Sequence, residues 1–103
     1  MPKVGEAQVI KALADVNRLQ ILNSLAEKPK YISVLAKELR LDRTTVAYHL
    51  ALLQSADLLE SHYEILEEPR SKGKAAHVYS VNVRKLREIL SSPLLKIIQE
   101  NLQ

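Results

Sequence analysis

Side chains that form hydrogen bonds without carrying a charge are concentrated in the segment from Thr44 to Ser55. Plotted as a helix, this segment has an apolar side and an opposite side of short, uncharged residues. The apolar side comprises Val46, Leu50 and Leu53, and the opposite side comprises Thr44, Ala47, Tyr48 and Ala51. A helix face that meets only solvent is normally charged or strongly polar. The pattern therefore predicts a helix that lies closely against another molecule. The alternative is an ordinary amphipathic helix whose exposed residues happen to be small.

The residue types on this face match the chemistry of DNA base edges. A threonine hydroxyl bonds base edges or phosphates, and its methyl group can contact thymine. Arg43, at the start of the segment, could form paired hydrogen bonds with guanine O6 and N7. The residues expected to lie in the major groove, with Arg43 at its rim, are Thr44, Thr45, Ala47 and Tyr48.

Helical periodicity predicts two helices before this region. The first covers about residues 4–14. The second begins at a cap provided by Asp15 or Asn17 and ends before Pro29. Its predicted inward face carries Leu19, Leu22, Leu25 and Ala26.

A third, short helix precedes the candidate recognition helix. Ser33 is its predicted N-cap, and Asp42 is the predicted cap of the helix from Thr44 to Ser55. Only Leu41, Asp42 and Arg43 separate the two. Two helices joined so tightly pack at a steep angle, so a helix-turn-helix is expected at about residues 34–55.

The chain after residue 58 alternates as strands do, with "LLESHYEILEE" and "AHVYSVN" flanking the turn "PRSKGKA". Arg70, Lys72 and Lys74 lie in this turn, and all the charged residues from Pro69 to Arg87 are lysine or arginine. The predicted hairpin, at about residues 59–82, would be a wing that holds phosphates. A solvated loop is the alternative, since charged turns are common.

The last predicted helix, at about residues 83–102, is capped by Asn82 and has a kink or restart at Ser92-Pro93. Its apolar residues are too numerous to be covered easily within a small domain, which favours an isologous dimer. The alternative is burial against the first helix. The residues expected in the dimer interface are Val4, Ile10, Leu86, Ile89, Leu90, Leu94, Ile97 and Ile98.

The expected fold class is mainly helical with a β-hairpin wing (α+β): a winged helix-turn-helix in one domain, residues 1–103, with four helices, two strands and a helix in that order. The sequence has no cysteine, no recognisable signal sequence and no apolar run of about 18 residues, so a cytoplasmic protein without a membrane segment is expected. No phosphate loop or nucleophile elbow is present, so neither an enzyme nor a cofactor is expected.

His49, His62 and His77 are the three histidines. His62 and His77 fall on opposite strands of the predicted hairpin and could approach each other, but no set of three or four ligands with defined spacing accompanies them. No metal site is therefore expected. His49 is expected to pack and form hydrogen bonds at the root of the recognition helix.

Three segments together resemble the ArsR family of winged helix-turn-helix repressors. They are "ALADVNRLQILNSL", "ISVLAKELRLDRTTVAYHLALLQSADLLE" and "GKAAHVYSVN". The resemblance covers nearly the whole chain. It implies a homodimer joined through the first and last helices that represses transcription from a palindromic operator. Some members of the family release DNA when a ligand binds; no effector can be identified here.

The chain departs from the family pattern in ways that affect its sites. Tyr31 and Ser33 occupy the positions of the family's Cys-x-Cys metal site, and the last helix has no histidine for a zinc site. Arg40 replaces the usual glycine of the turn and would need a left-handed backbone. Ala51 replaces a common lysine, which shifts the expected phosphate contacts to the wing and to Lys30, Lys37 and Arg43.

The sequence thus predicts a regulator of transcription that binds specific double-stranded DNA as a homodimer and acts as a repressor. One alternative is a winged-helix module for protein–protein interaction, although such modules usually lose the cations of the wing. Another is an architectural DNA binder that is indifferent to sequence.

Overall fold

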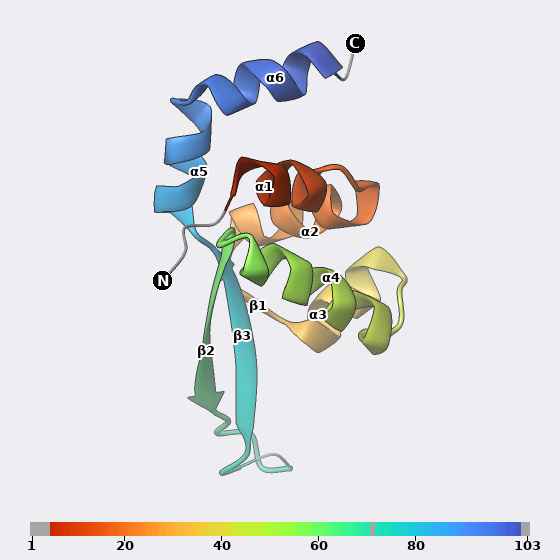
Figure 1. Ribbon diagram of the computed structural model, residues 1–103. Coiled ribbons are helices and arrows are strands. Elements are labelled where there is room, and N and C mark those ends of the chain that lie inside the picture. Colours follow the sequence, from red (N-terminus) through yellow and green to blue (C-terminus); the bar gives the residue numbers. More distant parts are fainter. Residues whose placement is uncertain (1–4, 71, 102–103) are drawn as a thin grey trace.

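The helices and strands follow the predicted order, with an additional strand and a divided C-terminal helix. The computed structural model describes residues 5–70 and 72–101 (Figure 1). The elements are α1 (Glu6–Leu13), α2 (Val16–Glu27), β1 (Lys30–Tyr31), α3 (Ile32–Leu39), α4 (Arg43–Ser55), β2 (Leu59–Ile65), β3 (Ala75–Val81), α5 (Val83–Leu90) and α6 (Pro93–Asn101). The predicted fold class, mainly helical with a β-hairpin, is confirmed.

The two differences have local causes. Strand β1 contains only two residues and pairs antiparallel with β3, so no periodic pattern could have revealed it. The single C-terminal helix of the prediction is two helices, α5 and α6, separated at Ser91 and Ser92. Proline has no N–H for the helix ladder and favours the first position of a helix, so Pro93 begins α6 at the predicted restart.

Side-chain caps begin three of the helices. Asp15 accepts hydrogen bonds from the amides of Asn17 and Arg18, Asp42 accepts one from Thr45, and Asn82 accepts one from Lys85. These predicted caps are confirmed. The cap predicted at Ser33 is wrong, because β1 runs directly into α3 and places Tyr31 at the N-cap without a side-chain bond.

The three-stranded sheet has the order β1-β3-β2, so β3 is central. The β2–β3 pairing runs from Leu59 opposite Val81 to Ile65 opposite Ala75. Only the inner end of this hairpin lies against the helices; its outer end projects beyond α3 and α4 (Figure 1). The molecule is consequently elongated, with extents of 50 × 31 × 22 Å.

A continuous apolar core is formed by helices α1, α2, α3, α4 and α5 together with the base of the hairpin. Its most completely buried large side chains are Ile21, Leu35, Leu50, Leu53, Leu58, Val9 and Val46. The predicted inward position of Leu19 is wrong, since that side chain is 47% exposed. Its neighbour Arg18 is buried instead, which rotates the inward face of α2 relative to the prediction.

Helices α5 and α6 lie at the end of the molecule opposite the hairpin tip (Figure 1). Among the predicted interface residues, Leu90 is exposed, Ile10 and Leu86 are half-buried, and Ile89 belongs to the core of its own chain. The burial of Ile89 leaves little of it for a partner. Val4 and the side chains of Leu94, Ile97 and Ile98 lie outside what the structure describes.

Asn82 links the end of α4 to the start of α5, and replacing it should destabilise the fold. Its Nδ2 donates to the carbonyl of Asp57 at 3.0 Å, while its Oδ1 accepts from the amide of Lys85. Asp57 has a positive φ of 62°, so this carbonyl closes an unusual turn. We expect Asn82→Ala to lower the free energy of unfolding by about 1–2 kcal/mol, because the helix cap and the second hydrogen bond of this buried side chain are lost.

Urea unfolding would measure this loss. Asn82→Asp keeps the capping acceptor but not the donor, and should fall between the wild type and alanine. Replacing exposed Asn23 by alanine is the matched control. Equal stability of Asn82→Ala and the control would contradict the assigned role.

Candidate nucleic-acid interface

The turn between α3 and α4 depends on a left-handed residue. Arg40 has φ 56° and ψ 41°, as predicted from the missing glycine. This conformation lets its amide bond the carbonyls of Ala36 and Lys37, while the amide of Leu41 donates to Ala36 O at 3.0 Å. Helix α3 therefore ends abruptly and α4 begins at Arg43.

Helix α4 has the two faces predicted for it. Its buried residues are Val46, His49, Leu50 and Leu53. Arg43, Thr44, Ala47 and Ala51 are exposed, and Tyr48 is 61% exposed. The described chain thus leaves an uncharged, hydrogen-bonding surface on α4 beyond Arg43.

Thr45 differs from the other predicted contact residues because it is half-buried. Its amide donates to Oδ1 of Asp42 at 2.7 Å. Hydrogen bonds from the amide and side chain of Thr45 hold the pKa of the Asp42 carboxyl below its usual value. These contacts favour a capping role for Thr45 over a base contact.

The hairpin turn carries the predicted cations into solvent. Arg70, Lys72 and Lys74 are all exposed. Inside the turn, the amide of Leu66 donates to Lys74 O at 2.8 Å, and the amide of Gly73 donates to Leu66 O at 3.0 Å. Gly73 has φ 83°, which explains the glycine at this position. The turn is thus closed by backbone bonds and leaves its charged side chains free of them.

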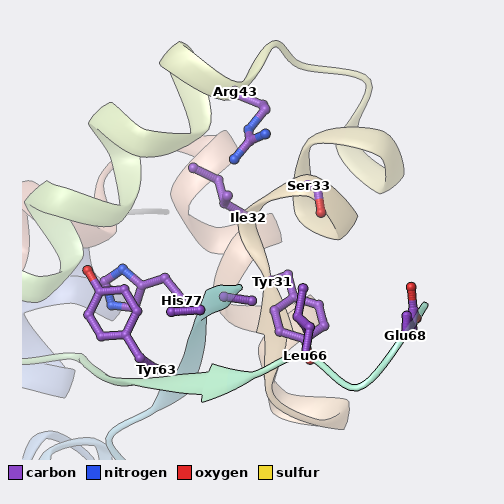
Figure 2. A pocket seen from close by; sticks show the side chains of 10 residues that line it. Tyr31, Ile32, Ser33, Arg43, Tyr63, Leu66, Glu68 and His77 are labelled. Atoms are coloured by element: carbon purple, nitrogen blue, oxygen red, sulfur yellow. The ribbon is translucent and has the colours of Figure 1, made fainter. Parts of the chain in front are cut away.

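A cleft of about 460 Å³ separates the start of α4 from the wing (Figure 2). Arg43 reaches into it from α4 above Ile32, and the rings of Tyr63 and His77 lie on the strand wall. These rings are stacked, with centroids 4.4 Å apart and planes 19° apart. This aromatic wall is not predictable from residue types alone, because the pairing of Tyr63 with His77 follows only from the strand register.

Lys30 does not have the environment predicted for a phosphate contact. Its side chain is 4% exposed and its ammonium lies 3.0 Å from Oε1 of Glu38 and 2.7 Å from Oγ of Ser24. Glu27 adds a carboxylate at 3.4 Å. These partners use the donors of Lys30, so this part of the prediction is corrected. Lys37 is exposed, as a phosphate contact requires.

The Glu38 carboxylate should contribute to stability only above strongly acidic pH. Hydrogen bonds from Ser24 and Lys30 lower the pKa of Glu38 in the folded chain. Its contribution is therefore complete above the unfolded value of about 4.3 and is lost as the pH falls through the lowered folded pKa. We expect Glu38→Gln to make unfolding less sensitive to pH across that window, by a small amount because the side chain is 41% exposed. Urea unfolding at a series of pH values would test this, and identical acid sensitivity would contradict it.

The strand histidines do not meet. His62 pairs with Val78 and His77 pairs with Tyr63, so the two imidazoles point to opposite faces of the hairpin. His62 Nε2 lies 3.1 Å from Glu64, and His77 Nδ1 shares a 3.0 Å hydrogen bond with the hydroxyl of Tyr79. Within residues 5–70 and 72–101, no group of three His, Cys, Asp or Glu side chains is placed to hold a metal.

Comparison with known proteins agrees with this architecture. The sequence profile described as "Bacterial regulatory protein, arsR family" matches residues 15–61, which include α2, α3 and α4. An uncharacterised HTH-type transcriptional regulator of Methanocaldococcus jannaschii is 36% identical over 99 residues, covering 96% of this chain and 92% of the relative. The chain belongs to the ArsR family. This ArsR-family protein is therefore a DNA-binding transcriptional regulator and not an enzyme.

Solved structures give the same answer for the fold. The crystal structure of a possible transcriptional regulatory protein of Mycobacterium bovis (fragment 1–100) has a TM-score of 0.67 and 26% identity, covering 91% of this chain and 89% of that one. A solution structure from the same organism, described as a homodimeric winged helix-turn-helix DNA-binding domain, has a TM-score of 0.64, covering 91% and 77%. The ArsR-family regulator is thus a winged helix-turn-helix protein, with α3 and α4 as the helix pair and β2–β3 as the wing.

The ArsR-family regulator lacks the family's cysteine metal site, because its sequence contains no cysteine. None of the helices in the described parts of the chain combines the length and apolar character needed to cross a membrane.

Proposed function

We propose that this regulator is a homodimer that represses transcription by occupying a palindromic operator. In the proposal, residues 1–103 act as one DNA-binding domain, and the two α4 helices enter successive major grooves about 34 Å apart. The observation that carries the proposal is the bare, uncharged face of α4 beside a projecting cationic hairpin. A surface of that kind suits base edges flanked by phosphates.

The assignment of residues to base-edge or phosphate contacts follows from the exposure of each side chain. Thr44, Ala47 and Tyr48 would contact base edges, and Arg43 would lie at the groove rim. Phosphates would be held by Arg70, Lys72, Lys74 and Lys37. Thr45 would serve chiefly as part of the cap, and Lys30 is left out because of its acidic partners.

Support for the dimer comes from two directions. The exposed Leu90 and the half-buried Ile10 and Leu86 leave apolar surface near α1 and α5. The Mycobacterium bovis domain with the same fold is described as homodimeric. We assign the interface to α1, α5 and α6.

Selection of bound sequences from a random duplex pool would test the proposal most directly. A palindromic consensus is expected, and specific duplex should compete better than random DNA. Equal competition would instead indicate an architectural binder. Absence of binding at low salt would favour a protein–protein module.

Replacing Tyr48 should change the choice among operators more than it changes affinity for DNA in general. We expect Tyr48→Ala to alter the preference at one or two base pairs of each half-site by about 1–3 kcal/mol, the usual effect of one mismatched pair. Tyr48→Phe keeps the ring and removes only the hydroxyl, so it separates the contribution of the hydroxyl from that of the ring. Competition among single-base operator variants at fixed salt would measure the change. An unchanged preference in Tyr48→Ala would remove this residue from the reading surface.

A further inference from the structure

Arg18 and His49 form a buried polar contact that none of the proposed DNA contacts uses. The residues are 7% and 6% exposed. Nη1 of Arg18 lies 3.1 Å from Nδ1 of His49. A guanidinium group has donors and no acceptor, so Nδ1 must accept and the neutral ring carries its proton on Nε2. The bond joins α2 to the buried side of α4.

The same guanidinium also holds the end of α1. Its Nε donates to the carbonyl of Ala12 at 2.7 Å, and its Nη2 donates to the carbonyl of Lys11 at 3.1 Å. Carbonyls in the last turn of a helix have few partners within it, and Lys11 O otherwise accepts a 3.3 Å bond from the amide of Ala14. A cation at this end is also favoured by the helix dipole. One side chain therefore connects α1, α2 and α4.

Asp15 anchors this side chain at its base. Its Oδ1 accepts from the amides of Asn17 and Arg18 at 2.8 and 3.1 Å, and its Oδ2 lies 3.9 Å from Nη1. Burial alone would raise the pKa of Asp15, but the amide bonds and the charge of Arg18 lower it. The charged carboxylate thus keeps Arg18 directed towards α1 and His49.

The hydrogen bond at His49 restrains the rotation of α4 about its own axis, which apolar packing restrains less. Apolar contacts have little directional preference, whereas a hydrogen bond weakens steeply when its angle changes. Because the side chains of a helix lie about 5–6 Å from its axis, a rotation of about 10° moves the reading surface by about 1 Å. The His49 ring also meets the ring of Tyr48 edge-on, with centroids 5.3 Å apart.

We propose that Arg18 and His49 are positioning residues that set the orientation of α4 relative to α1. With α1 in the dimer interface, they match the two α4 helices to two half-sites at once. The inference rests on the proposed dimer and its operator. Neither residue touches DNA; the pair controls how much tighter a paired site binds than a single half-site.

The test compares two duplexes: one selected by the wild type from a random pool, and the same duplex with one half-site scrambled. We expect His49→Leu to reduce the ratio of the two affinities by about tenfold, the worth of a hydrogen bond to a charged group. Asparagine places an oxygen near the position of Nδ1, so His49→Asn should keep most of the ratio. Thermal unfolding of each variant accompanies the binding measurements.

A purely structural role would lower both affinities together and leave their ratio unchanged, which would overturn the inference. Equal losses in His49→Leu and His49→Asn would do the same. If His49→Leu fails to fold, Arg18→Lys serves instead, because one ammonium cannot reach all three acceptors and the ratio should fall. A wild type that binds both duplexes equally would refute the dimeric operator and, with it, this inference; a preserved wild-type preference with an unchanged variant ratio refutes the inference alone.

Discussion

Replacing Lys72 and Lys74 together by alanine should weaken binding to every DNA sequence by a similar factor. Both side chains are exposed at the hairpin turn, whose backbone bonds do not involve them. In the proposed complex their ammonium groups would act as point charges on phosphates and would carry no information about base sequence. The choice among operators should therefore persist in the double variant.

The size of the effect follows from counterion release. If each lysine neutralises one phosphate, a dimer of the double variant loses about four contacts. The slope of log affinity against log salt should then become shallower by about 3–4, because each contact contributes about 0.9. At moderate salt the loss of affinity should exceed about a hundredfold. Gel shifts with specific and random duplexes across a salt series would measure both quantities.

Removal of two other lysines provides the control for net charge. Lys11 and Lys96 are exposed on α1 and α6, away from the hairpin tip. Alanine at both positions changes the charge by the same amount, yet it should leave the salt slope nearly unchanged. Equal slopes for the two double variants would mean that the wing does not hold phosphates.

The parts of the structure that the sequence predicted correctly depend on local rules. The two faces of α4 follow from helical periodicity, and the caps at Asp15, Asp42 and Asn82 require only neighbouring amides. The left-handed Arg40 was inferred instead from the family resemblance, because it replaces the glycine usual at this position. The exposed surface of α4 was therefore predictable before any packing was known.

The errors arise where a charged side chain is buried because it finds its partners on neighbouring helices. Leu19 was expected in the core, but Arg18 takes the inward place because α1 and His49 satisfy its guanidinium. Lys30 was expected to meet phosphates. Its ammonium is instead paired with the carboxylate of Glu38 on α3, and its backbone forms part of β1. A sequence pattern reports polarity and spacing, and it cannot show that acceptors on neighbouring elements will stabilise a buried charge.

The correction at Arg18 changes how the interface must be understood. A fold held by apolar contacts alone would leave α4 free to rotate slightly within its core. The polar contact from α2 links α4, the proposed DNA-reading helix, to the end of α1. The two faces of α4 remain distinct: its apolar face helps to hold the domain together, and its opposite face is exposed.

Leu50→Ala should cause a large loss of stability. Leu50 is 1% exposed in the core. Truncating a buried leucine costs about 2–5 kcal/mol, which is a large part of the roughly 5–15 kcal/mol that stabilises a small protein. We expect a clearly lower urea midpoint by far-ultraviolet circular dichroism at fixed protein concentration, and weaker binding to all duplexes as the folded fraction falls.

Tyr48→Ala on the opposite side of the same helix is the matched comparison. Because Tyr48 is 61% exposed, its replacement should change stability by no more than about 0.5 kcal/mol while altering operator preference. A large loss of stability in Tyr48→Ala would mean that its ring supports the fold and is not reserved for DNA. A negligible loss of stability in Leu50→Ala would mean that Leu50 does not lie on the core-facing side of α4. The contrast between the two variants tests the assignment of faces on α4 without knowledge of the operator.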